Sequence, residues 1–338
     1  MTDRDPFTLS CAPNVSIKAK FGNGKIISDD KKIDCCISQW HLLRPLLIAL
    51  PNTQAFMPVM LIENYRQKAF NNNKSKMIFM IVYSMLMSFF FTSVYFINQN
   101  EKALELTFIG LILTCYFTFE YHFISNNINI VTNRSILVTN TYLDTRGCFL
   151  LWLVFLFLVG LWQLLLNYRT GSFEESVFLY GGIYEEISQG DWWRLLSASF
   201  FHSGIAHWLI NAVSILMVAP LFKMLVGSYG ISVFILGCFV GAASSYMTFI
   251  LGDNAHNAYA GLSGGFFSLI GYIAIFSHKF KRDASNGLFF SFINFLIMSI
   301  LLSHILAPSI SNIAHCSSFL VGATLTIFQK PKINKNDD

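Results

Sequence analysis

Long apolar runs are the feature that most constrains this chain. Several of them reach the roughly 20 residues that a helix needs to cross the hydrocarbon core of a bilayer. A soluble domain carries about 25% charged residues, whereas this chain of 338 residues is 12% charged and 54% hydrophobic. In lipid, only helices and closed barrels satisfy every backbone polar group. The sequence therefore predicts an all-α polytopic membrane protein.

Eight spans are expected from the apolar runs. The first two, residues 77–97 and 104–124, are joined by a short polar link and predict a helical hairpin. We place the other six at residues 148–166, 205–225, 229–251, 263–278, 288–306 and 310–328. The chain then divides into an N-terminal cytoplasmic region with the hairpin (1–147), a six-span domain (148–328) and a basic cytoplasmic tail (329–338).

The sequence predicts the secondary structure of the soluble part of the N-terminal region less clearly. Residues 15–27 alternate apolar and polar side chains around Gly22-Asn23-Gly24, a pattern that favours a β-hairpin. Residues 125–147 also look partly β-like, so the small cytoplasmic region has room for β structure. Residues 1–34 lack the apolar core of a signal peptide, and the first apolar helix is expected to act as an uncleaved insertion signal.

The distribution of basic residues predicts the orientation, because short cytoplasmic loops carry an excess of Lys and Arg. If the spans alternate, one side receives only Lys102, Arg169 and Arg194. The other side receives Lys74, Lys76, Arg134, Arg146, Lys223, Lys279, Lys281, Arg282, Lys330, Lys332 and Lys335. Both termini are therefore expected in the cytoplasm, and the span at 263–278 begins on the outer side.

Polar residues gather at the predicted outer ends of three spans. Ser263 lies among glycines where one span begins, and His315 lies near the start of the last span. His207 and Asn211 are four residues apart, so they share one face of a third helix. A polar group inside a membrane helix is costly and marks a functional site by default.

This set of side chains suits nucleophilic acyl transfer. A serine hydroxyl needs a neighbouring base, and neutral histidine is the usual one, which makes His315 the candidate. Small residues let helices approach closely, and they form one stripe at Ser318 and Gly322 and a matching one at Gly264, Ser268 and Gly271. Asn211 and His207 are positioned to supply hydrogen bonds to an oxyanion beside the Ser263 amide.

Four motifs occur together in this order. They are Trp193-Arg194, then His202 with His207 and Asn211, then Gly261-Leu262-Ser263-Gly264, and finally Ala314-His315 with Gly322 seven residues after the histidine. With these motifs the chain resembles the rhomboid intramembrane serine proteases of bacterial type over about residues 148–328. It carries an extra N-terminal region. The resemblance implies a six-helix rhomboid core.

The resemblance also implies roles for these residues. Ser263 would be the nucleophile and His315 the general base of a dyad without an acidic third member. His207, Asn211 and the Ser263 backbone amide would form the oxyanion hole, and His202 would be structural.

Two further residues of the resemblance, Trp193 and Arg194, would brace the first outer loop. The sequence departs from the family pattern at two positions. Ser318 replaces a glycine that often follows the histidine, a change between small residues that should preserve helix packing. Phe267 stands where many bacterial members have a tyrosine, and it can stack on the histidine but cannot donate a hydrogen bond.

The function that follows is an intramembrane serine endopeptidase. The resemblance implies that it cleaves transmembrane segments of single-span membrane proteins near the outer face of the bilayer. It implies no cofactor or metal, and the inner (plasma) membrane of a bacterium as the location. The alternative is a catalytically silent rhomboid-like protein that binds membrane clients. Such relatives lose the serine or the histidine, whereas this chain keeps both Ser263 and His315.

Other classes fit the sequence less well. Gly252-Asp253 lacks the Tyr-Asp pair of the intramembrane aspartyl proteases, and no His-Glu-x-x-His string of a zinc protease occurs. The seven cysteines include no Cys-x-x-Cys pair, and no basic stripe with interleaved aromatics favours nucleic acid. A transporter often has two related halves, and we find none. Glu120, inside an apolar run, has no evident partner in the sequence.

Overall fold

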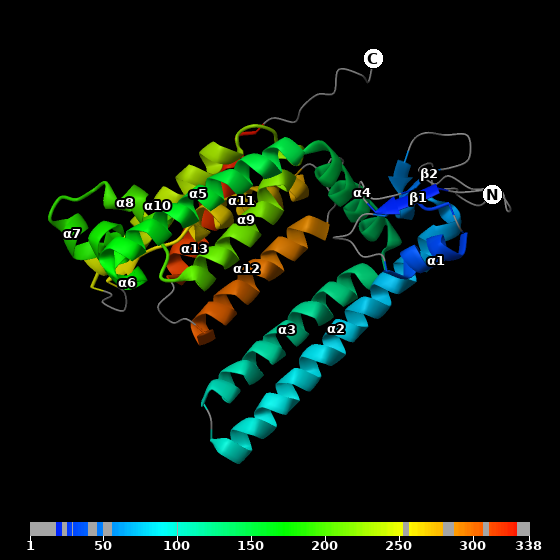
Figure 1. The fold of residues 1–338 in the computed structure, drawn as a ribbon, viewed down its shortest axis with the longest axis horizontal. Coiled ribbons are helices and arrows are strands. Elements are labelled where there is room, and N and C mark those ends of the chain that lie inside the picture. Colours follow the sequence, from blue (N-terminus) through cyan, green and yellow to red (C-terminus); the bar gives the residue numbers. More distant parts are fainter. Residues whose placement is uncertain are drawn as a thin grey trace. The chain divides into compact units, whose positions relative to one another are not determined.

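The structure is a computed structural model, and it divides into two compact units, Met1–Asp144 and Thr145–Asp338. Figure 1 shows the fold. The predicted turn at Gly22–Gly24 and the predicted tail after Gln329 lie outside the described residues. The structure describes residues 18–21, 26–28, 30–39, 46–49, 56–99, 101–252, 257–279, 287–306 and 311–329.

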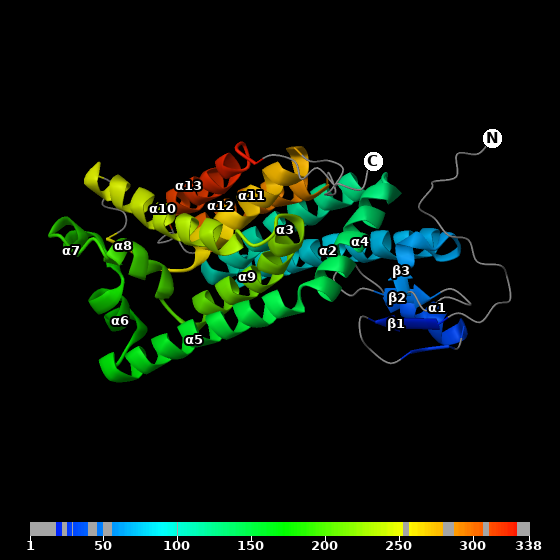
Figure 2. The same ribbon diagram turned by 90° about the horizontal axis from the view of Figure 1, so that it is seen from above.

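The first unit contains a small antiparallel sheet beside a short helix (Figure 2). Its strands are β1 (Lys18–Phe21), β2 (Leu46–Ala49) and β3 (Phe56–Pro58), in that order. The helix α1 (Asp30–Gln39) and the 3-10 turn η1 (Val59–Leu61) complete the part of this unit that precedes the long helices. Apolar side chains of these elements form one buried cluster, including Ile33, Ile37 and Ile48. Ala19 also pairs with Ile27 in antiparallel fashion, as the predicted hairpin requires.

Two long helices, α2 (Glu63–Asn98) and α3 (Glu101–Ser125), lie side by side as an antiparallel hairpin (Figure 1). They contain the predicted spans 77–97 and 104–124. Their contact is made of small and hydroxyl residues, because apolar side chains gain little from meeting each other in lipid. The Ser88 hydroxyl donates to the Thr107 carbonyl (2.9 Å), and the Ser84 and Thr114 hydroxyls lie 2.9 Å apart.

The β-like interpretation of residues 125–147 is wrong, because they form the helix α4 (Ile128–Asp144). The β-branched residues that suggested a strand recur at helical spacing, and Val131, Thr132 and Ser135 are buried. Their hydroxyl groups do not break the helix, since the Thr132 hydroxyl donates back to the Ile128 carbonyl (2.9 Å).

This helix also supplies the partner that the sequence did not reveal for Glu120. The Arg134 guanidinium lies 2.9 Å from the Glu120 carboxylate, and both side chains are buried. A buried carboxylate is expensive to leave unpaired, so this ion pair accounts for an acidic residue within an apolar helix.

Six helices of the second unit coincide with the six spans predicted for residues 148–328. They are α5 (Arg146–Thr170), α9 (Ile205–Leu225), α10 (Gly230–Ile250), α11 (Ser263–Lys279), α12 (Gly287–Leu306) and α13 (Asn312–Leu325). Among the described helices, α2, α3, α5, α9 and α10 are long and apolar enough to cross a membrane. Together these helices confirm the predicted all-α polytopic fold.

The connection between α5 and α9 is itself structured. It contains α6 (Phe173–Tyr180), α7 (Tyr184–Ser188), α8 (Arg194–Ser197) and the 3-10 turn η2 (Ala198–Phe200). Its two-residue strand β4 (Gly182–Ile183) pairs with β5 (Ala258–Tyr259), which lies just before α11. The connection therefore reaches the segment that leads into Ser263.

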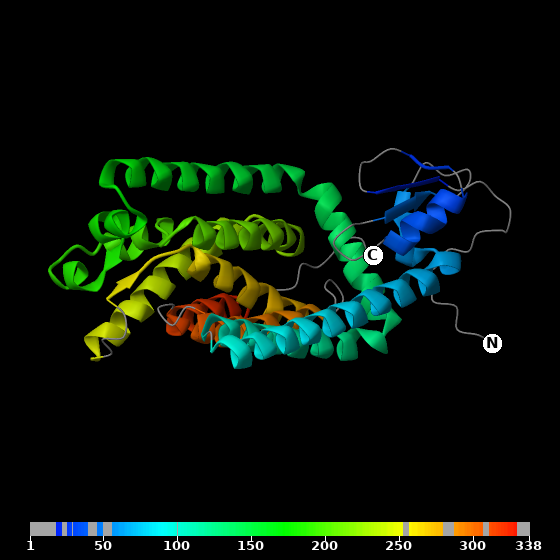
Figure 3. The same ribbon diagram turned by 60° about the horizontal axis from the view of Figure 1, so that its bottom comes forward.

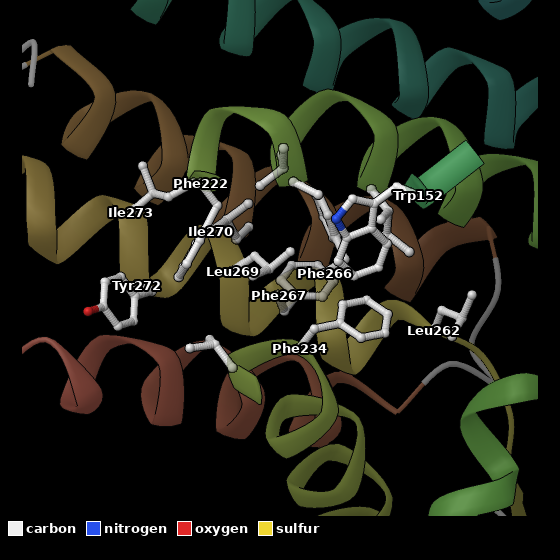
Figure 4. Packing of buried hydrophobic residues seen from close by; sticks show 14 of the residues in the cluster. Trp152, Phe222, Phe234, Leu262, Phe266, Phe267, Leu269, Ile270, Tyr272 and Ile273 are labelled. Carbon is white, nitrogen blue, oxygen red and sulfur yellow. The ribbon is translucent and has the colours of Figure 1, made fainter. Parts of the chain in front are cut away.

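Helix α11 is the centre of the second unit, in contact with α9, α10, α12 and α13, whereas α5 lies at one edge (Figure 3). Its apolar side chains meet Trp152, Phe222 and Phe234 from three surrounding helices (Figure 4). With 17 residues, α11 is about 25 Å long, which is less than the roughly 30 Å of a hydrocarbon core. We infer that at least one end of α11 lies within the depth of the hydrocarbon core.

Helices α11 and α13 approach each other at glycines. A β-carbon on Gly322 would overlap the Ser268 carbonyl, and one on Gly271 would overlap the Phe319 carbonyl. Because backbone atoms fill the space where side chains would stand, the two helices are in direct contact along this seam.

Gly322→Ala is therefore expected to lower the free energy of unfolding by about 1–3 kcal/mol, the usual cost of overpacking a filled core. Unfolding in detergent, followed by circular dichroism, measures the change. Gly147→Ala is the matched control, since nothing lies within 4 Å of a β-carbon at that position. Equal stability of the two variants would contradict the tight seam.

Candidate active site

Ser263 is the first residue of α11, and the chain enters this helix through a segment held on both sides. The Tyr184 amide donates to the Asn257 carbonyl (3.0 Å), and the Gly261 amide donates to the Ala198 carbonyl (3.2 Å). Gly261 has φ +119°, a backbone conformation that side chains disfavour, so the turn before Ser263 requires glycine here.

The Ser263 hydroxyl oxygen lies 3.0 Å from His315 Nε2 on α13. Both side chains are buried, with exposed fractions of 9% and 8%. The Phe267 ring, one turn along α11, stacks on the imidazole with centroids 4.2 Å apart and planes 25° apart. Within the described part of the chain, His315 Nδ1 has no hydrogen-bond partner. The contact is therefore a two-residue arrangement oriented by an aromatic ring.

His207 and Asn211 on α9 face the backbone just before Ser263. A β-carbon on Gly261 would lie 2.9 Å from His207 Nε2 and 3.5 Å from Asn211 Nδ2. Asn211 Nδ2 is buried and has no hydrogen-bond partner among the described residues. The Ser203 hydroxyl lies 3.3 Å from His207 Nδ1. Hydrogen-bond donors on α9 thus converge on the start of α11.

His202 is fully buried and ties the same segment to α5. Its Nε2 accepts from the Leu262 amide (3.5 Å), and its Nδ1 lies 3.2 Å from the Gln163 amide oxygen. The Gln163 amide nitrogen donates in turn to the His202 carbonyl. Burial, with a smaller effect of neighbouring His207, lowers the pKa of His202 to about 3. The imidazole is therefore neutral at pH 7, as this pattern of bonds requires.

Trp193 and Arg194 lie in the connection between α5 and α9 and do not reach Ser263. The buried Arg194 guanidinium donates to the Asp191 carboxylate (3.0 Å) and to the Phe178 (3.3 Å) and Gly181 (3.0 Å) carbonyls. It also lies 4.9 Å from the centroid of the half-exposed Trp193 ring. The Arg194 side chain therefore holds together separate parts of the connection between α5 and α9.

Two residues near the site were missed from the sequence. Gln163 is the one strongly polar side chain between residues 148 and 166, and this isolation could have singled it out. Tyr259 donates its hydroxyl to the Gly261 carbonyl (3.3 Å), and burial raises the pKa of this phenol. Tyr259 is one of 13 tyrosines and belongs to no motif, so nothing in the sequence singled it out as a site residue.

The structure thus brings Ser263, His315, His207 and Asn211 to one end of the bundle. Gly264 packs against α10, where a β-carbon would lie 2.8 Å from the Gly237 carbonyl. Gly322 lies two turns along α13 from His315, in the seam with α11. A polytopic helical membrane protein with a buried serine–histidine contact is the class that the fold and the site define.

Comparisons with known proteins point to one family. Residues 189–331 match the model of the rhomboid domain family. "Putative rhomboid protease YdcA" of Bacillus subtilis (strain 168) is 28% identical over 140 residues, which cover 40% of this chain and 68% of the relative. Both matches support a rhomboid family protein. These likenesses support a protease role within the membrane.

Gln163→Leu should destabilise the fold, because His202 Nδ1 and the His202 carbonyl would lose their buried partner. An unsatisfied buried polar group costs about 1–3 kcal/mol. Unfolding in detergent measures the loss, and Leu165→Ala, on the exposed face of α5, is the control. If the two variants unfolded alike, the proposed bracing of His202 would be wrong.

Acidification should expose the role of the neutral His202. Its folded pKa of about 3 lies below the ordinary histidine value of about 6.5. The unfolded chain therefore binds the extra proton, and stability falls as the pH drops from about 6.5 toward 3. The midpoint of unfolding in detergent should fall less steeply with decreasing pH in His202→Asn than in the unchanged protein. Parallel pH profiles would refute this.

Proposed function

We propose that this protein is an intramembrane serine endopeptidase that works through a Ser263–His315 dyad. The observation that carries the proposal is the 3.0 Å contact between the Ser263 hydroxyl oxygen and His315 Nε2, buried at the N-terminal ends of two helices. A serine hydroxyl becomes a useful nucleophile when an adjacent imidazole takes its proton. The rhomboid domain supports the same reaction class.

The first chemical step follows from this contact. The Ser263 hydroxyl oxygen attacks the carbonyl carbon of the scissile peptide bond, and its proton moves to His315 Nε2. This requires the tautomer with hydrogen on Nδ1, which leaves Nε2 free to accept. Stacking on Phe267 holds the ring plane in place during the transfer.

The tetrahedral intermediate places negative charge on the former carbonyl oxygen. We assign its stabilisation to Asn211 Nδ2, His207 Nε2 and the Ser263 backbone amide, with Gly261 leaving room for the substrate. If the Ser203 hydroxyl donates to His207 Nδ1, the hydrogen of His207 resides on Nε2 and faces the oxyanion. The unpartnered amide of Asn211 is a donor already in position, which avoids reorganisation during the reaction.

Collapse of the intermediate breaks the peptide C–N bond. The imidazolium of His315 gives its proton to the leaving amine, and the acyl group stays on the Ser263 oxygen. Water then attacks this ester with His315 again acting as base, and the carboxylic acid product leaves the regenerated hydroxyl. No cofactor or metal is needed for these steps.

We place the reaction near the non-cytoplasmic face of the membrane. Helices α9, α11 and α13 all begin at the end of the bundle that holds the site, and Lys223 and Lys279 lie at the opposite ends of α9 and α11. The positive-inside rule puts those cations in the cytoplasm. Both termini and the soluble part of the first unit are then cytoplasmic, and we propose the inner membrane of a bacterium as the location.

The proposed substrates are single-span membrane proteins, cut within or beside their transmembrane segments. A helical peptide bond is shielded by its own hydrogen bonds, so the substrate must unwind locally before Ser263 can reach it. We expect helix-weakening residues near the cut and a small residue before it.

Ser263→Ala should abolish cleavage of a single-span reporter protein in reconstituted vesicles, because no other group would carry the acyl intermediate. The control is Ser277→Ala, a buried serine at the far end of the same helix whose hydroxyl donates only to the Ala274 carbonyl in the described structure. A fluorophosphonate should label the unchanged protein and the control, but not Ser263→Ala. Cleavage that survives Ser263→Ala would refute the proposal, and an intact, unlabelled protein would favour the silent client-binding alternative.

Asn211→Leu should lower kcat by about 10²–10³, the effect of removing one oxyanion donor in other enzymes. Its KM should change little, because the charge develops only in the transition state. Steady-state cleavage of the reporter protein measures both constants. A variant that raised KM and kept kcat would instead place Asn211 in substrate binding.

A further inference from the structure

An apolar groove opens on the side of the second unit between α5 and α10, and none of its lining residues belongs to the candidate site. Its volume is about 540 Å³, within the range of small-molecule sites. Trp152, Phe234 and Leu269 form a buried floor, with the two ring centroids 5.0 Å apart (Figure 4). Leu151 and Ile235 on the rim are exposed.

The groove is polar at one end only. Lys223, Gly227 and Ser228 lie there, where α9 ends and the chain turns into α10. The Lys223 ammonium donates to the Ser228 hydroxyl (2.9 Å). At the other end Leu196 and Phe200, from the connection between α5 and α9, line the groove. An occupant must therefore be apolar over most of its length and polar where it meets Lys223.

The charges around the groove have one sign. The segments that line it, residues 146–170 and 194–252, contain no aspartate or glutamate. Lys223 is the charged residue of the lining, and Arg146 precedes the lining residue Cys148 by two positions on α5. An anionic group at this end would meet cations and no repelling carboxylate from these segments.

We propose that the groove binds one acyl chain of an anionic phospholipid, with the lipid phosphate at Lys223 and Ser228. The surrounding bilayer supplies this occupant, and the anionic lipids of a cytoplasmic leaflet attract basic groups at the membrane surface. The first amide groups of α10, which begins at Gly230, add donors beside the same phosphate. A neutral lipid would fill the apolar part but leave the cation unmatched.

The dimensions suit part of an acyl chain. The groove follows α10 from Gly230 to Cys238, a rise of about 12 Å at 1.5 Å per residue. The end of the chain would pack beneath Phe200, two residues before the buried His202. The bound lipid would thus support the segment that His202 fastens to the start of α11.

Native mass spectrometry of the full-length protein tests the proposal. The protein is stripped of lipid in detergent and titrated with dioleoyl phosphatidylglycerol or dioleoyl phosphatidylcholine. We expect one phosphatidylglycerol to be retained at least ten times more strongly than phosphatidylcholine. Equal retention of the two lipids would overturn the headgroup assignment and with it the proposal.

Two pairs of variants locate the binding. Ile235→Trp should fill the groove and lower phosphatidylglycerol retention at least tenfold, whereas Leu236→Trp, next to it on α10 and outside the lining, should not. Lys223→Gln should lower retention several-fold, whereas Arg169→Gln, which removes one cation at the far end of α5, should not. Equal effects within either pair would overturn the proposal.

A measurement on the unchanged protein covers the case in which a variant fails to fold. Phosphatidylglycerol that carries a diazirine in one acyl chain is photolysed with the protein in vesicles, and the adducts are mapped by peptide mass spectrometry. Adducts should concentrate on Leu151 and Ile235, compared with Leu158, which is exposed on α5 but does not line the groove. Uniform labelling of exposed residues on α5 would overturn the proposal.

Discussion

The hydrogen bond between Ser263 and His315 depends on a packing contact two turns further along the same helices. Gly322 lies seven residues after His315, and its backbone meets the Ser268 carbonyl on α11. Gly271 makes the converse contact with Phe319. Because apolar side chains gain little from meeting in lipid, such close packing holds helices together in a membrane. A β-carbon at either glycine would separate α11 from α13 and open the 3.0 Å contact.

Helix packing alone does not complete the site, since the turn before Ser263 must also be fixed. Three ties from the preceding connection hold it: the β4–β5 pair, the Gly261 amide on the Ala198 carbonyl, and His202 on the Leu262 amide. The third tie ends on Gln163 of α5, a helix at the edge of the bundle. A long connection that looked like a loop in sequence thus acts as a brace between α5 and the start of α11.

The sequence predicted those parts of the molecule that are governed by strong local rules. Apolar length located the six helices of the second unit, and the serine and two histidine motifs located side chains that meet in space. Prediction from the sequence failed where local propensity competes with packing. Residues 125–147 looked partly β-like, yet burial of one helical face and hydroxyl bonds such as Thr132 to Ile128 favour the helix α4. The role of Tyr259 and the partner of Glu120 could not be predicted, because both depend on the three-dimensional fold and not on a local sequence pattern.

The absence of a partner for His315 Nδ1 within the described residues is consistent with the apolar setting of the site. A carboxylate placed there would be a buried charge, and such a charge is stable only with a compensating cation and further hydrogen bonds. The first unit illustrates that requirement, since its buried Glu120 is matched by Arg134 at 2.9 Å. A neutral serine–histidine pair avoids the cost, and the ring orientation that a carboxylate provides in a Ser-His-Asp triad comes here from stacking on Phe267. In the proposed reaction, positive charge arises on His315 only as the oxyanion forms beside it, so each charge is balanced by the other.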